Sequence, residues 1–139
     1  MGARTTWAIK TEDGNAVVWL YSHWGGESKF EDTQEALKQA EPRWEDVSYG
    51  ARIFISQIIG KQWDSETGFG ITTGTLDEVP FEEEYDLVFV DFTRKMITYG
   101  RFEFTFSEFI DGKEAYRTAA GKMTFDENYQ NRANAKAGA

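Results

Sequence analysis

Residues 16–26, AVVWLYSHWGG, join the most apolar early run of the chain to a loop that carries its only histidine. The run at 16–21 is rich in valine and aromatic side chains, which is typical of a β-strand. It ends at His23, Trp24 and a glycine pair. We therefore expect a strand that delivers polar and aromatic side chains to one edge of a sheet, with the remaining elements supporting that edge.

A β-hairpin is predicted over residues 5–21. Residues 5–10 alternate apolar and polar side chains, which is the period of a half-buried strand. The turn at 12–15 contains Asp13-Gly14, a pair that readily adopts the positive φ angles of a tight hairpin turn. Residues 16–21 are the return strand.

Two helices are predicted between the glycine pair and residue 60. The spacings Ser28-x-x-Glu31 and Asp32-x-x-Glu35 fit capping boxes, so a helix begins near residue 28, and Pro42 limits its length. A second helix is predicted over residues 46–60. Its apolar stripe, at helical intervals, consists of Val47, Ala51, Phe54, Ile55 and Ile58. The run 53–55 also fits a strand, but the length and flanks of the segment favour a helix.

Further strands are predicted at 69–73, 86–92 and 96–99, the last two forming a second hairpin. The alternating phenylalanines at 102–106 fit another strand, whereas 107–110 also fit a helical turn. The prediction is an α+β fold with one antiparallel sheet of about five strands, including two hairpins, and two helices on one face. We expect one domain over residues 1–125 and a frayed polar tail at 126–139.

Composition excludes several classes of function. The net charge of −9 argues against direct binding to a nucleic-acid backbone. The chain has no cysteine and one histidine, so we predict no disulfide, no metal site and no cofactor. No apolar run approaches the ~20 residues of a membrane span. The first ten residues lack the apolar centre of a signal peptide, so we expect a cytoplasmic protein without membrane association.

His23 is the natural candidate for acid–base chemistry, because histidine titrates near neutral pH. The neighbouring Ser22 is an unsuitable partner, since adjacent side chains on a strand point to opposite faces. The sequence also lacks a G-x-S-x-G elbow. We therefore predict no catalytic residue. A hydrolase that uses His23 is the least favoured interpretation.

A composite ligand pocket is the more specific hypothesis. Aromatic side chains offer stacking surfaces, and the forked guanidinium groups of Arg43 and Arg52 suit phosphate, so together they suit a nucleotide-sized ligand. The candidate ligand-binding residues are Tyr21, Ser22, His23, Trp24, Gly25, Gly26, Arg43, Trp44, Tyr49, Arg52, Glu66, Thr67 and Gly68. The competing interpretation is that the aromatic side chains fill the core and the arginines are surface charges.

The acidic charge is concentrated in one segment. Residues 71–92 carry seven acidic side chains and no basic one. The candidate partner-binding residues are Asp77, Glu78, Glu82, Glu83 and Glu84. These carboxylates could imitate phosphates towards a protein partner, or they could form an ordinary solvated loop.

Four motifs resemble, in the same order, a family of small uncharacterised proteins of tailed phages and prophages. They are Tyr-Ser-His-Trp-Gly-Gly at 21–26, Arg43-Trp44 with Asp46, Tyr49 and Arg52-Ile53, Glu-Thr-Gly-Phe-Gly-Ile at 66–71, and Val90-Asp91. The resemblance covers roughly residues 15–110, and it carries no established chemistry. It implies a phage accessory protein acting in the cytoplasm of an infected bacterium.

Accessory phage proteins without an enzyme motif often counteract bacterial defence, so class analogy suggests three roles. The first is a non-enzymatic protein that sequesters a small nucleotide-type signal in the composite pocket. The second is an acidic, protein-directed inhibitor of a defence complex, in the manner of an anti-CRISPR nucleic-acid mimic. The third is the hydrolase. A homo-oligomer is compatible with each of them.

Overall fold

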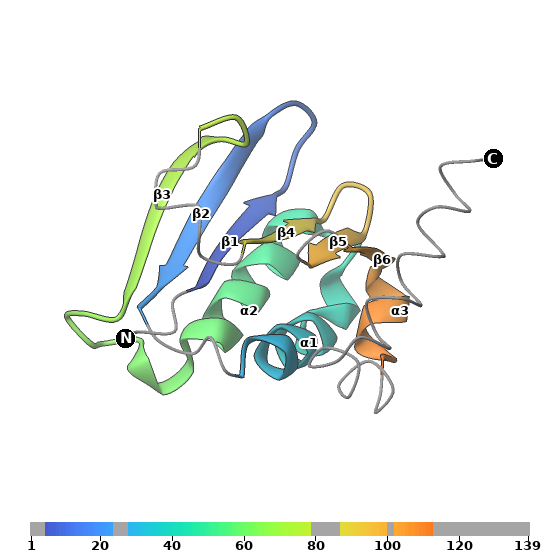
Figure 1. Ribbon diagram of the computed structural model, residues 1–139. Helices are drawn as coiled ribbons and strands as arrows, with labels where there is room; N and C mark the ends of the chain where they lie inside the picture. Colours follow the sequence, from blue (N-terminus) through green and yellow to red (C-terminus); the bar gives the residue numbers. More distant parts are fainter. Residues whose placement is uncertain (1–4, 24–27, 79–86, 100–101, 113–139) are drawn as a thin grey trace.

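The computed structural model describes residues 5–23, 28–78, 87–99 and 102–112, which form one sheet with a layer of helices (Figure 1). The strands are β1 (Thr5–Lys10), β2 (Ala16–Ser22), β3 (Phe69–Thr75), β4 (Leu87–Asp91), β5 (Met96–Tyr99) and β6 (Phe102–Thr105). The helices are α1 (Lys29–Gln39), α2 (Val47–Ile59) and α3 (Phe106–Ile110), with 3₁₀ turns η1 (Glu41–Arg43) and η2 (Gly60–Gln62). The predicted tail at 126–139 lies outside the described residues.

The sheet has six strands in the order β3-β2-β1-β4-β5-β6, and it is mixed. Both predicted hairpins are present, with β1 antiparallel to β2 and β4 antiparallel to β5. The prediction of a purely antiparallel, five-stranded sheet is wrong, because β4 pairs in parallel with β1 and β6 extends the sheet. A parallel pair of strands needs a long crossover connection, and here residues 11–86, which join β1 to β4, provide it.

The helices lie on one face of the sheet, as Figure 1 shows, and the main core lies between the two layers. Phe54 of α2 and Leu37 of α1 are fully buried there. The predicted second helix is confirmed, since α2 begins after Asp46 and ends at Gly60, which has a φ of +56°. Helix α3 is a further short helix, with a capping box between Thr105 and Glu108.

Two polar side chains in the core bond across the elements, whereas the buried Thr5 Oγ1, Thr6 Oγ1 and Trp19 Nε1 have no hydrogen-bond partner among the described residues. The Trp7 indole N–H on β1 donates to Thr33 Oγ1 on α1 at 3.0 Å. The Gln34 side-chain amide donates to the carbonyl oxygen of Phe109 in α3 at 2.9 Å. Because an unpaired buried donor is costly, these bonds fix α1 in position relative to β1 and α3.

The helix layer does not cover the whole width of the sheet. Trp7, Leu20 and Ile71 are register partners on β1, β2 and β3, so their side chains lie in one row on the helix side. Trp7 is 2% exposed and Leu20 is 0% exposed, whereas Ile71 is 57% exposed. The helices therefore cover β1 and most of β2, and Phe69 at the start of β3 still packs against the core, but the helix-side face of β3 is open from Ile71 onward.

The opposite face of the sheet has a second, smaller buried cluster around Trp19, with Ala8 and Val17. A Cβ at position 74 would lie 3.2 Å from Trp19 Nε1, so Gly74 lets β3 pass close to the indole ring. None of the helices in the described part of the chain has the length and apolar character needed to cross a bilayer.

Candidate functional site

The structure brings two of the sequence motifs together at one end of the sheet. The backbone N–H of His23 donates to the carbonyl oxygen of Gly68 at 2.8 Å. Tyr21 and Ser22 pair with Gly70 and Phe69 on the neighbouring strand. The end of β2 and the start of β3 therefore lie side by side, as Figure 1 also shows.

His23 is held by its neighbour on the same strand. Tyr21 Oη and His23 Nδ1 are 2.9 Å apart, because residues two apart on an extended chain point to the same face. Ser22 points to the opposite face and is buried. Glu66 and Thr67 are exposed beside this end, and Trp63, earlier in the same connection, is 78% exposed. Trp24, Gly25 and Gly26 lie outside the described residues.

The remaining candidate residues surround the start of α2, at the other end of the sheet. A Cβ at Gly50 would lie 3.0 Å from Phe92, which directly follows β4. The carboxylate of Glu45 pairs with Lys95, in the turn after β4, at 3.4 Å. The final residue of β4 lies beside Lys10 of β1, whereas Ser22 lies beside Thr5. These two ends of β1 are about 17 Å apart at 3.3 Å per residue.

The contacts of these residues are those of core and surface groups. Trp44 is 9% exposed, and its indole N–H donates to the carbonyl oxygen of Leu37 at 3.0 Å. Arg43 lies over the ring of exposed Tyr49, 5.4 Å from its centroid. Arg52 is exposed and donates to Ser56 Oγ, one turn along the same helix. The described residues therefore do not assemble into one pocket that combines both arginines with His23.

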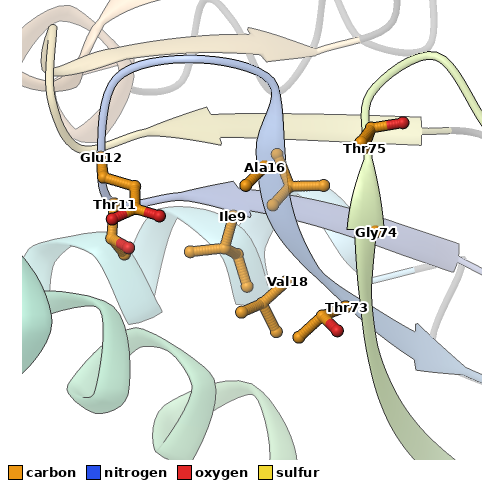
Figure 2. A pocket seen from close by; sticks show the side chains of 9 residues that line it. Ile9, Thr11, Glu12, Ala16, Val18, Thr73, Gly74 and Thr75 are labelled. Atoms are coloured by element: carbon orange, nitrogen blue, oxygen red, sulfur yellow. The ribbon is translucent and has the colours of Figure 1, made fainter.

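A groove that the sequence analysis did not predict lies on the open helix side of the sheet (Figure 2). Its volume is about 340 Å³. The lining residues are Ile9, Thr11, Glu12, Ala16, Val17, Val18, Thr73, Gly74 and Thr75, and we call this the β3 groove. Ile9, Val18 and Thr73 are register partners, and Figure 2 shows their side chains on the same side of three neighbouring strands. Ile9 is buried, Val18 is half-buried and Thr73 is exposed, so the groove opens towards β3.

Glu12 lines one end of the β3 groove, and three further acidic residues lie in the segments that adjoin this end. Glu12 and Asp13 lie in the turn between β1 and β2, and Asp77 and Glu78 directly follow β3. The two segments are adjacent, because Leu76 N–H donates to the Asn15 carbonyl oxygen at 3.1 Å. All four carboxylates are on exposed residues, and we call them the acidic rim. Glu82, Glu83 and Glu84 lie outside the described residues.

A second hollow, between α1 and α3, has the character of a solvated helix surface. It is lined by Glu31, Asp32, Gln34, Glu35, Lys38 and Ile110. Its acidic groups are engaged locally, since Ser28 donates to Asp32 at 2.8 Å and Gln39 donates to Glu35 at 2.6 Å. Within the part of the chain that the structure describes, no group of His, Asp and Glu side chains is arranged to hold a metal ion.

Comparison of the chain with protein-family models, curated proteins and solved structures finds no match. The β3 groove and the His23 end of the sheet are the candidate sites among the described residues.

Proposed function

We propose that this chain is a non-enzymatic binding protein, and that its ligand is a segment of another protein held in the β3 groove. The observation that carries the proposal is the exposed wall of this groove, formed by the helix-side face of β3. Thr73 and Thr75 line the groove and are exposed, and Ile71, next along the same face of β3, is 57% exposed. Apolar and threonine side chains presented beside a row of backbone groups suit an extended polypeptide.

The charge of the groove favours a basic partner. The acidic rim places Glu12 and Asp13 beside Asp77 and Glu78 at one end of an otherwise uncharged strand. Complementary charge across an interface raises the association rate and suppresses wrong partners more than it raises affinity. The expected ligand is therefore a segment with apolar side chains for the groove and lysine or arginine for the rim.

The motif resemblance to phage proteins supports a biological setting for this binding. In that setting the partner is a bacterial defence protein, and occupation of its basic segment blocks it. This is the protein-directed alternative of the sequence analysis, with Asp77 and Glu78 as part of the contact surface.

The test is selection of twelve-residue peptides from a random displayed library on the immobilised protein. We expect enriched peptides that combine apolar and basic residues. Their affinity is expected to fall about tenfold or more in Thr73→Glu, because a longer charged side chain would occupy the space of the ligand's apolar side chains and lose its own hydration there. Thr72→Glu is the matched control, because Thr72 is exposed on the same strand but points to the opposite face.

Two outcomes would overturn the proposal. One is the absence of any enriched peptide. The other is an equal loss of affinity in Thr72→Glu and Thr73→Glu, which would separate binding from the β3 groove. Binding is also expected to weaken as salt rises, because exposed charges are screened over about 8 Å at physiological ionic strength.

A second candidate function is capture of a small nucleotide-type signal at the His23 end of the sheet. The observation that favours it is the contact between His23 and Gly68, with exposed Trp63 in the connection that leads to β3. Cyclic mono-, di- and trinucleotides are screened by thermal shift, where a ligand at 100 times its Kd stabilises by about 2.7 kcal/mol. Binding at this end is lost in Trp63→Ala and retained in Arg52→Ala, at the other end. A screen without a shift, or the reverse pattern, rejects it.

A further inference from the structure

Strand β3 is an edge of the sheet with an unusual composition for that position. It is seven residues long, and residues 68–76 contain no charged residue and no proline. Edge strands in natural proteins are usually short, charged, bulged or covered, because their free backbone groups attract other chains. Strand β3 has none of the first three protections along its length, so its outer edge is suited to pairing.

The backbone bonds at the two ends of β3 define which groups face outward. His23 N–H bonds to Gly68, and Leu76 N–H bonds to Asn15. Hydrogen-bonded pairs alternate along an antiparallel ladder, so Gly70, Thr72 and Gly74 bond to β2. The N–H and C=O groups of Ile71 and Thr73 consequently point away from the sheet. Among the described residues, no hydrogen bond to these outward groups is found.

The other edge strand, β6, is closed by its own chain. It has only four residues, and Glu103 adds a charge that pairs with Arg94 at 3.6 Å. On the same ladder logic Thr105 N–H faces outward, and it donates to Glu108 Oε1 at 2.9 Å. Helix α3 begins at the next residue, Phe106. The two edges therefore differ, and β3 is the one with outward groups available along its length.

We infer that β3 takes an extended segment of a partner protein as an added strand of the sheet. The inference rests on the proposed function and specifies how the β3 groove holds its ligand. Ile71 and Thr73 offer their backbone groups outward, and their side chains lie on the helix-side face. An added strand that bonds to them places every second side chain on that same face, beside the groove. Its other side chains lie on the opposite face of the sheet, away from the groove.

The charges make a second copy of this chain a poor occupant. Self-pairing of β3 about a two-fold axis at Ile71 or Thr72 brings Glu78 of one copy to Asp64 or Glu66 of the other. These residues flank β3 and do not belong to it, and like charges brought together at an interface oppose association. The whole chain also carries a net charge of −9, which adds repulsion between copies. A partner segment with a lysine or arginine near the acidic rim is attracted to the rim.

Amide exchange followed by NMR tests the inference directly, with the library-selected peptides as the probe. In the free protein, the amides of Gly70, Thr72 and Gly74 are expected to be protected, whereas those of Ile71 and Thr73 exchange rapidly. Saturation with a selected peptide is expected to slow the exchange of Ile71 and Thr73 about tenfold or more. Peptide binding that leaves both amides unprotected would overturn strand addition.

The substitution Thr73→Pro gives an independent readout. It removes an outward N–H without removing a bond to β2, and proline is tolerated on edge strands. We expect selected peptides to lose about tenfold or more in affinity. Thr73→Val keeps the N–H and is the matched control. If Thr73→Pro does not fold, the exchange measurement on the wild-type protein decides the question.

The outcomes separate this inference from the proposed function. Peptides that lose affinity in Thr73→Glu but bind Thr73→Pro as tightly as wild type leave the groove as the site and refute strand addition. Failure to select any peptide refutes both. Protection of Ile71 and Thr73 that rises with protein concentration, without peptide, would assign the edge to a second copy and overturn the choice of occupant.

Discussion

Replacing Gly50 by alanine sets two physical effects against each other. Gly50 lies in α2, where alanine is the better helix former by about 1 kcal/mol. Helix propensity alone therefore predicts that Gly50→Ala stabilises the protein. The tertiary structure predicts the opposite, because a Cβ at this position would lie 2.5 Å from the Arg43 carbonyl oxygen and 3.0 Å from Phe92 Cε2.

The magnitude follows from which neighbour has to move. The carbonyl of Arg43 belongs to the backbone and already accepts a hydrogen bond from Asp46 N–H at 3.0 Å. It cannot rotate away as the end of a flexible side chain could, so α2 has to shift from η1 and Phe92. Overpacking by one methyl group costs about 1–3 kcal/mol, and a backbone contact belongs at the upper end of that range. After the gain in helix propensity, we expect a net loss of about 1–2 kcal/mol.

Thermal and urea unfolding, followed by tryptophan fluorescence and circular dichroism, measure this loss. For a chain of this size, 1 kcal/mol corresponds to about 4 °C, so the Tm of Gly50→Ala is expected to fall by about 4–8 °C. Ser48→Ala is the matched control, because Ser48 is exposed in the same helix. If Gly50→Ala proves as stable as Ser48→Ala, the close approach of α2 to η1 and Phe92 is not present in solution.

Three further substitutions test the core by urea unfolding. Phe54→Ala is expected to lower the free energy of unfolding by about 3–5 kcal/mol, because Phe54 is fully buried, and a change below about 1 kcal/mol would contradict the packing of α2 on the sheet. Thr33→Val leaves the Trp7 indole N–H without its acceptor and is expected to cost about 1–3 kcal/mol, whereas Thr33→Ser retains the oxygen and most of the stability. Thr105→Ala removes the side-chain cap of α3 and is expected to cost about 1 kcal/mol, and equal stability of Thr105→Ala and wild type would show that the cap contributes nothing.

Local interactions are the part of the fold that the sequence by itself determined. The hairpin of β1 and β2 follows from two strand-forming runs around Asp13-Gly14, and Gly14 has a φ of +101°. The prediction of a half-buried strand at 5–10 is wrong, because β1 is buried on both faces from Thr5 to Ile9. The limits of α2 follow from a stripe of apolar residues over 47–58 and from Gly60, where the helix ends. In both cases the deciding contacts lie within a few residues along the chain, where spacing and turn chemistry are readable.

The pairing of distant strands was decided by the tertiary structure. Alternation predicts that 86–92 is a strand, but it does not say that this strand joins β1 in parallel. The same limit applies to the capping boxes. Ser28 bonds to the Asp32 side chain and provides no side-chain cap for α1, while the capping box that does form is at Thr105 and Glu108.

The same distinction between local pattern and tertiary packing applies to the residues of the candidate site. The sequence grouped His23 and Gly68 in one candidate pocket, and the ladder between β2 and β3 places these two residues side by side. It could not assign Trp44 to the core or put Arg52 at the far end of the sheet. An aromatic residue has the same pattern whether it faces a ligand or another helix, and only the direction of α2 across the sheet separates the two cases.

The β3 groove was decided by the tertiary structure alone. The uncharged run at 68–76 is the one sequence signal that points to it, because such a run is unusual on an exposed edge. Whether that edge is covered depends on how far the helix layer extends over the strands. The packing of α1 and α2 against Trp7 and Leu20 sets that extent, and it leaves Ile71 in solvent. Packing between residues distant in the chain leaves no local pattern in the sequence. The sequence therefore predicted the strand at 69–73 but not which of its faces is open to solvent.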